Sequence, residues 1–114
     1  MPYKELNEQQ KKHVDLVIYH ETLHNHNNAT ARYDAIKGYD HAVIGFVTEQ
    51  RNKHAEKIKA APDVYASTAQ IAEHKIKSDK GLSAKCAGLA KHLTALPNPG
   101  VKITPQKEGW ETEL

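Results

Sequence analysis

Helix-forming sequence extends almost without interruption from about Tyr3 to Leu96, and this feature constrains the fold more than any other. Pro62 is the only proline inside this range, and polar turn residues separate the remaining segments. Apolar residues recur at spacings of three and four, as the buried face of a helix requires. We therefore predict an all-α fold in which antiparallel helical hairpins form a three- or four-helix bundle over residues 1–96.

Four helical segments are expected, the first of them half-buried. The Asn-rich stretch at 25–28 suits a tight turn, because asparagine tolerates left-handed backbone angles, and so short a link makes the first two helices an antiparallel hairpin. Pro62 favours a new helix, because proline fits the first helical turn. The expected helices span residues 4–24, 31–61, 63–77 and 82–96.

The last two helices each have an apolar face, and we expect both faces to be buried in the bundle. The fourth helix has a seam with a 4-3-4-3 spacing, which is typical of packed helices. The apolar positions are Val64, Thr68, Ile71, Ala72 and Ile76 in the third helix, and Leu82, Cys86, Leu89, Leu93 and Leu96 in the fourth.

Small residues form a second face on the expected helix at 31–61. Gly38, Ala42 and Gly45 lie on this face. A glycine inside a helix costs up to ~1 kcal/mol relative to alanine, so two of them seven residues apart indicate close approach by another helix. We identify this face as a candidate interaction surface.

The last residues, 97–114, contain three prolines and two glycines, which prevent a long helix and predict an extended C-terminal arm. Trp110, the only tryptophan of the chain, lies on this arm. A single large aromatic side chain on a mostly polar arm either docks on the bundle or anchors a protein partner. Trp110 is therefore a second candidate for interaction.

The composition predicts a thin core. Hydrophobic residues make up 39% of the 114 residues, but the chain has one Trp, one Phe and one Met, and much of its apolar content is alanine. Alanine buries little area, so close helix packing, self-association or a partner must complete such a core. The formal net charge of +2 is too small to indicate a nucleic-acid partner.

Cys86 is the only cysteine, so no disulfide can form within the chain, and this usage suits a reducing compartment. The first 30 residues are polar, and no apolar run approaches the ~18 residues that a membrane span needs. A soluble cytoplasmic protein without a membrane partner is therefore expected.

One short motif indicates a specific chemistry. His20 and His24 are the histidines of an H-E-x-x-H sequence, and their four-residue spacing on a helix lets both imidazoles bind one metal ion. Glu21 has the position of a general base that activates a metal-bound water. The five residues resemble the zinc-binding motif of the zincin metallopeptidases, and the resemblance implies zinc on His20 and His24 and a catalytic base at Glu21.

The expected hairpin suggests a third ligand. If the turn is centred at residues 27–28, Asp34 lies level with Glu21 and between the two histidines along the helix axis. His20, His24 and Asp34 with an open fourth position would satisfy zinc. Neither the substrate-binding strand nor the downstream histidine of the zincins is evident, and a di-metal carboxylate site lacks its second Glu-x-x-His.

A simpler interpretation makes the motif histidines partly exposed, hydrogen-bonding residues near a helix end, where imidazoles interact favourably with the helix dipole. The isolated histidines His13, His41 and His54 are expected to be hydrogen-bonded residues of the core or of an interface.

Two functions are consistent with these observations. The first is a non-enzymatic protein-interaction or assembly protein, which acts without a cofactor through helix faces and the C-terminal arm, on a protein partner or on a second copy. The alternative is a small zinc-dependent hydrolase in which His20, His24 and Asp34 hold the zinc ion and Glu21 activates water.

Overall fold

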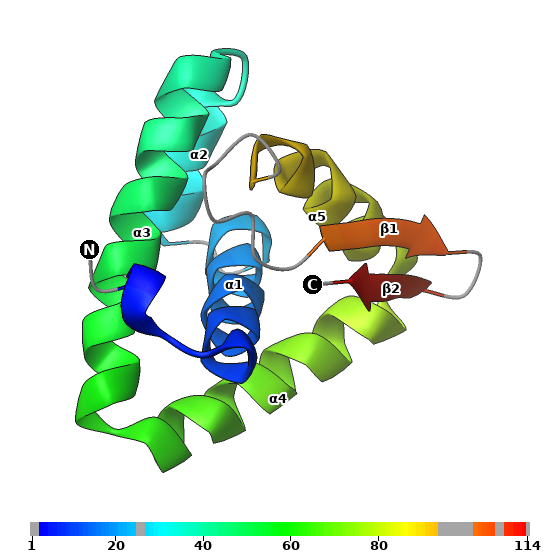
Figure 1. Ribbon diagram of the computed structural model, residues 1–114. Helices are drawn as coiled ribbons and strands as arrows, with labels where there is room; N and C mark the ends of the chain where they lie inside the picture. The colour runs from blue at the N-terminus through cyan, green and yellow to red at the C-terminus, as the bar shows by residue number, and fades with distance from the viewer. Residues whose placement is uncertain (1–2, 25–26, 94–101, 107–108, 114) are drawn as a thin grey trace.

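The computed structural model describes the backbone of residues 3–24, 27–93, 102–106 and 109–113, and the side chains among them up to residue 89. The predicted all-α bundle is confirmed, because the helices pack against one another (Figure 1). In chain order the described elements are η1 (Tyr3–Glu5), α1 (Glu8–Leu23), α2 (Asn28–Ile36), α3 (Asp40–Ala60), α4 (Pro62–Ser78), α5 (Lys80–Leu93), β1 (Lys102–Gln106) and β2 (Gly109–Glu113).

The C-terminal arm contains a β-hairpin. β1 and β2 pair antiparallel, with Lys102 opposite Glu113 and Gln106 opposite Gly109. The pair lies beside α5 at one side of the bundle (Figure 1). The predicted boundary between bundle and arm, at residues 96 and 97, lies outside the described residues.

α1 lies in the middle of the bundle (Figure 1). Every residue from Val14 to Tyr19 is buried, and Thr22 is buried as well. Successive helical residues point about 100° apart, so continuous burial means that neighbours enclose the helix on all sides. Those neighbours are α2, α3, α4 and α5. The expectation of a helix buried along one face is therefore wrong for residues 14–19, while residues 8–13 are exposed or partly exposed.

Two apolar clusters pack around α1. One joins Leu16 and Tyr19 to the first half of α3 and to α5, and it includes the predicted seam residues Leu82, Cys86 and Leu89. The other joins the remaining apolar residues of α1 to the second half of α3, to α4 and to the N-terminal segment. The side chains of Leu93 and Leu96, the last two residues of the predicted seam, lie outside the described ones.

The predicted continuous helix at 31–61 is wrong, because α2 and α3 are separate helices. The Tyr39 N–H donates to the Ile36 carbonyl at 2.8 Å, which closes a tight turn instead of continuing α2. Gly38 weakens the helix at this point, and Asp40 favours the N-terminus of a new one. The register assumed for the helical hairpin is not formed either, because the Thr30 hydroxyl, not Asp34, lies beside the Glu21 carbonyl, at 2.9 Å.

The predicted buried face of α4 is also partly wrong. Val64 is 69% exposed and Ile71 is 58% exposed. The exposed pair Val64 and Ile71 and the buried pair Tyr65 and Ala72 both have a spacing of seven residues, so periodicity alone does not decide which pair is buried. The core takes the neighbouring positions, which are Tyr65, Ala69, Ala72 and Ile76.

A buried charged cluster joins the N-terminal segment to α1 and α3. Arg51 donates from Nε to Asp15 Oδ1 at 3.0 Å and from Nη2 to Oδ2 at 2.9 Å. The Tyr3 hydroxyl lies 3.1 Å from each carboxylate oxygen, and Arg51 Cζ lies 4.3 Å from the centre of the Tyr3 ring. Burial, with the nearby Asp15 carboxylate second, raises the pKa of Tyr3, which keeps its hydroxyl neutral. Buried charges are tolerated only with hydrogen bonding as complete as this.

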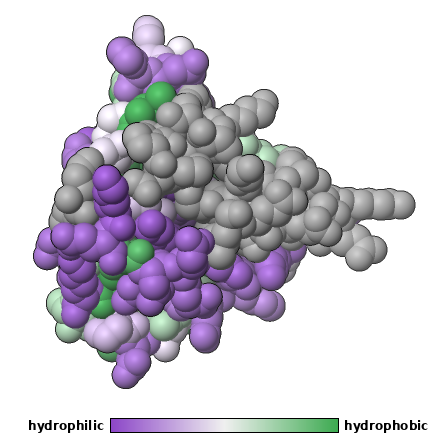
Figure 2. Space-filling model, in the orientation of Figure 1, coloured by the Kyte–Doolittle hydropathy of each residue, from purple (hydrophilic) through white to green (hydrophobic). Residues whose placement is uncertain are grey.

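The described part of the face seen in Figure 2 is mostly polar. In Figure 2 the coloured residues are largely hydrophilic, and apolar residues occupy small separate spots. None of the described helices has the length and apolar character needed to cross a membrane.

We predict that Asp15→Asn lowers the free energy of unfolding by about 3–5 kcal/mol, because it leaves the Arg51 charge buried and uncompensated. The matched control is Glu49→Gln, which removes a carboxylate that accepts two hydrogen bonds from Arg32 at 3.0 Å on the surface. That change should leave stability almost unchanged, because exposed ion pairs contribute little. Urea unfolding of both variants measures the difference, and losses of equal size would contradict the assignment.

Candidate functional site

The H-E-x-x-H motif lies in the last turn of α1. His24 ends the helix, and its N–H donates to the His20 carbonyl at 2.9 Å. The two imidazole rings are neighbours, with centroids 4.9 Å apart and planes inclined by 37°. The structure therefore brings the two motif histidines together at the C-terminal end of the central helix.

Glu21 belongs to a different group of side chains. Its Oε2 lies 3.1 Å from His54 Nε2 on α3, and His54 Nδ1 lies 2.7 Å from the Tyr65 hydroxyl on α4. A neutral imidazole fits this order, since Nε2–H donates to the carboxylate and Nδ1 accepts from the phenol. The three side chains connect three helices, and we call them the Glu21–His54–Tyr65 chain.

The pKa shifts of Glu21 and Tyr65 favour a structural role for the Glu21–His54–Tyr65 chain. The hydrogen bond from His54 is the main cause that lowers the pKa of Glu21, and burial opposes it. Burial is the main cause that raises the pKa of Tyr65, so the phenol stays protonated and is a poor nucleophile. The Glu21 carboxylate is committed to His54, which leaves it badly placed as a base for water bound at the histidines.

Asp34 does not join the motif histidines. It lies exposed on α2, with its Oδ1 3.7 Å from Lys37 Nζ. Among residues 3–24 and 27–89, no three His, Cys, Asp or Glu side chains come close enough to hold a metal ion together. The physical reason is the register of the turn between α1 and α2: the Thr30 hydroxyl donates to the Glu21 carbonyl at 2.9 Å, so Thr30, one turn before Asp34, lies level with Glu21.

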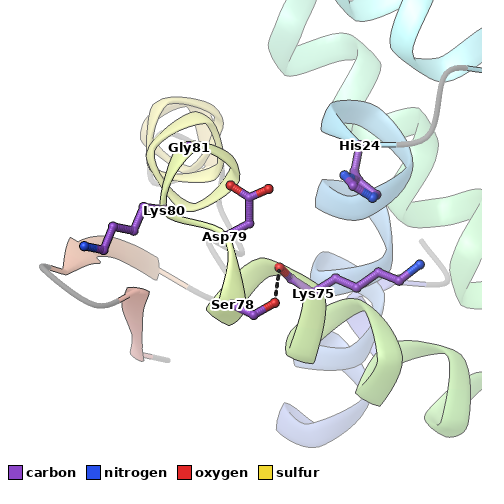
Figure 3. A pocket seen from close by; sticks show the side chains of 6 residues that line it. All are labelled: His24, Lys75, Ser78, Asp79, Lys80 and Gly81. Atoms are coloured by element: carbon purple, nitrogen blue, oxygen red, sulfur yellow. Dashed lines mark hydrogen bonds between the residues drawn. The ribbon is translucent and has the colours of Figure 1, made fainter.

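An open cleft of about 660 Å³ lies next to His24 (Figure 3). Asp79 on its far side caps α5, because its Oδ1 accepts a hydrogen bond from the Leu82 N–H at 3.0 Å. Sequence reasoning missed this cleft, since only the tertiary fold brings the end of α1 to the junction of α4 and α5. The lining residues are His24, Lys75, Ser78, Asp79, Lys80 and Gly81.

The candidate interaction residues are all on the surface or outside the described side chains. Gly38, Ala42 and Gly45 are exposed, and a Cβ built on either glycine would meet nothing within 4 Å. Within the described part of the chain, no helix therefore makes the expected close approach to these glycines. Trp110 lies in β2, and its side chain is not among those described.

The surroundings of His54 and Cys86 indicate structural residues of the core. His54 is buried and hydrogen-bonded at both ring nitrogens, as predicted for a core histidine. Burial raises the pKa of Cys86 to about 12, so the thiol is not a nucleophile at neutral pH.

Comparison with known proteins adds no assignment, because no protein-family model matches the chain and no curated protein or solved structure is similar to it.

We predict that wild type is more stable than Glu21→Gln at neutral pH and that this advantage disappears in acid. Glu21 has an ordinary pKa of 4.5, which folding lowers. The stabilisation from its ionised form is therefore present above 4.5 and is lost as pH falls through the lowered folded pKa. Thermal unfolding of both proteins across this pH range measures the gap, and a gap that stays constant would contradict the role of the carboxylate.

Proposed function

We propose that this chain is a non-enzymatic association protein that acts through the outward face of α4. The observation that supports this proposal is the exposure of two large apolar side chains, Val64 at 69% and Ile71 at 58%. They lie seven residues apart and so on one side of the helix, outside the buried positions of α4. A second apolar stripe outside the core is typical of a helix that pairs with another helix.

Thr68 completes this stripe between the two apolar residues. Its hydroxyl donates to the Val64 carbonyl at 3.1 Å, so pairing would bury no unsatisfied hydroxyl. We call Val64, Thr68 and Ile71 the outer α4 stripe.

A second copy of the chain fits the outer α4 stripe. The helix has an acidic residue, Asp63, in its first turn and the basic residues Lys75 and Lys77 in its last turn. Two such helices side by side and antiparallel place opposite charges and opposite dipole ends together, with Val64 opposite Ile71 of the second copy. The same surface of both copies forms this contact, so a two-fold axis relates the two copies. Two-fold symmetry is the commonest symmetry of homo-oligomers.

Other surfaces extend the proposal to larger assemblies. Gly38, Ala42 and Gly45 leave the backbone open to a partner helix, and the neighbouring Tyr39 is 70% exposed. Trp110 on the arm stays a predicted partner contact. We propose that the outer α4 stripe forms the primary contact, because it combines apolar area with charge complementarity.

Association has better support than zinc-dependent hydrolysis. The hydrolase needs a free general base and a third protein ligand for the metal. Glu21 is hydrogen-bonded to His54, and among the described side chains no third ligand accompanies His20 and His24.

We predict a weak, concentration-dependent dimer, because one helix pair buries less than the ~800 Å² per partner of a standard interface. Sedimentation velocity over a range of concentrations should show monomer passing to dimer in the wild type. Val64→Glu and Ile71→Glu should each keep the chain monomeric, because both place a charge in the contact.

The matched control is Gln70→Glu, which adds the same charge at an exposed position of α4 outside the stripe. It should leave the dimer intact. A wild type that stays monomeric at every concentration would contradict the proposal, as would equal effects of the three variants.

A further inference from the structure

We propose that His20 and His24 bind one late first-row divalent transition-metal ion, of the class of Cu²⁺, Ni²⁺ or Zn²⁺. This inference does not depend on the association of the chain. It rests on the arrangement of the two side chains and on what surrounds them.

The first argument is geometric. The helical hydrogen bond from the His24 N–H to the His20 carbonyl, 2.9 Å long, fixes both backbones one turn apart. Two histidines four residues apart on a helix lie on one face within reach of a single metal ion, and the ring centroids, 4.9 Å apart, show that these two imidazoles are already neighbours.

The second argument is the state of His20. Its Nε2 is buried and has no hydrogen-bond partner among the described residues. An unpaired buried nitrogen carries a free-energy cost that a bond to metal removes.

The donor set determines the class of ion. Two imidazoles without a carboxylate favour late transition metals over Mg²⁺ and Ca²⁺, which prefer oxygen ligands. With two protein ligands, water occupies the remaining positions and the affinity is modest. Lys75 lies in the cleft beside His24 and repels a cation, but its exposed side chain is long enough to move aside (Figure 3).

The test is calorimetric titration of untagged protein with Ni²⁺ or Zn²⁺ at a concentration where the chain is monomeric. We expect one ion per chain, no heat with Mg²⁺, and a dissociation constant at least about tenfold higher in His20→Ala and in His24→Ala. Lys75→Gln should bind more tightly, because it removes a nearby positive charge.

The matched control is His41→Ala, which removes an exposed histidine of α3 and should leave binding unchanged. Unchanged affinity in both motif variants, or an equal loss in the control, would overturn the site. A measurement on the wild type does not depend on the folding of any variant: substoichiometric Ni²⁺ should broaden the NMR signals of the His20 and His24 imidazoles first. Earlier broadening of any other histidine would also overturn it.

Discussion

A carboxylate buried in the middle of the central helix is the constraint on which the rest of this structure depends. Asp15 has no exposed side-chain surface, so its charge must be neutralised by a partner that arrives from elsewhere in the fold. Arg51 supplies two hydrogen bonds from α3, and Tyr3 adds its hydroxyl from the N-terminal segment. Any packing that separates these three elements leaves a buried charge unpaired.

A second buried polar group, His54, also requires partners from other helices, and one of them lies on α4. His54 lies one turn beyond Arg51 on α3 and connects Glu21 of α1 to Tyr65 of α4. The hydrogen bond to Tyr65 and the burial of Ala69, Ala72 and Ile76 belong to the same inward side of α4. Val64 and Ile71 then lie on the outside, and the association surface that we propose is a consequence of how the interior is paired.

The sequence predicts the regular parts of the fold because they depend on local chemistry. Pro62 begins α4 where proline is favourable, and the seam of Leu82, Cys86 and Leu89 is buried as its spacing indicates. The side of α4 that faces outward could not be predicted, because it depends on tertiary contacts such as the hydrogen bond between His54 and Tyr65. One signal was present: Asp15 is a charged residue inside an otherwise apolar run, and such a residue requires a partner.

The candidate site likewise has parts that the local sequence predicts and parts that only the tertiary fold determines. The neighbouring positions of His20 and His24 follow from helical periodicity alone. Asp34 was placed by assuming a turn centred at residues 27–28, but α1 ends at Leu23 and α2 begins at Asn28, and Thr30 contacts the Glu21 carbonyl in its place. The commitment of Glu21 to His54 depends on two helices that meet only in the folded chain.

Amide hydrogen exchange of the wild-type chain, measured at a low and a high protein concentration, tests the account most directly. If α1 is the enclosed centre, the amides of residues 14–19 exchange slowest at both concentrations, and those of α2, which has no buried residues, exchange much faster. If α4 is the association surface, residues 64–71 become slower at the high concentration while α2 does not change. Exchange in α1 as fast as in α2, or protection of α4 that is independent of concentration, would contradict it.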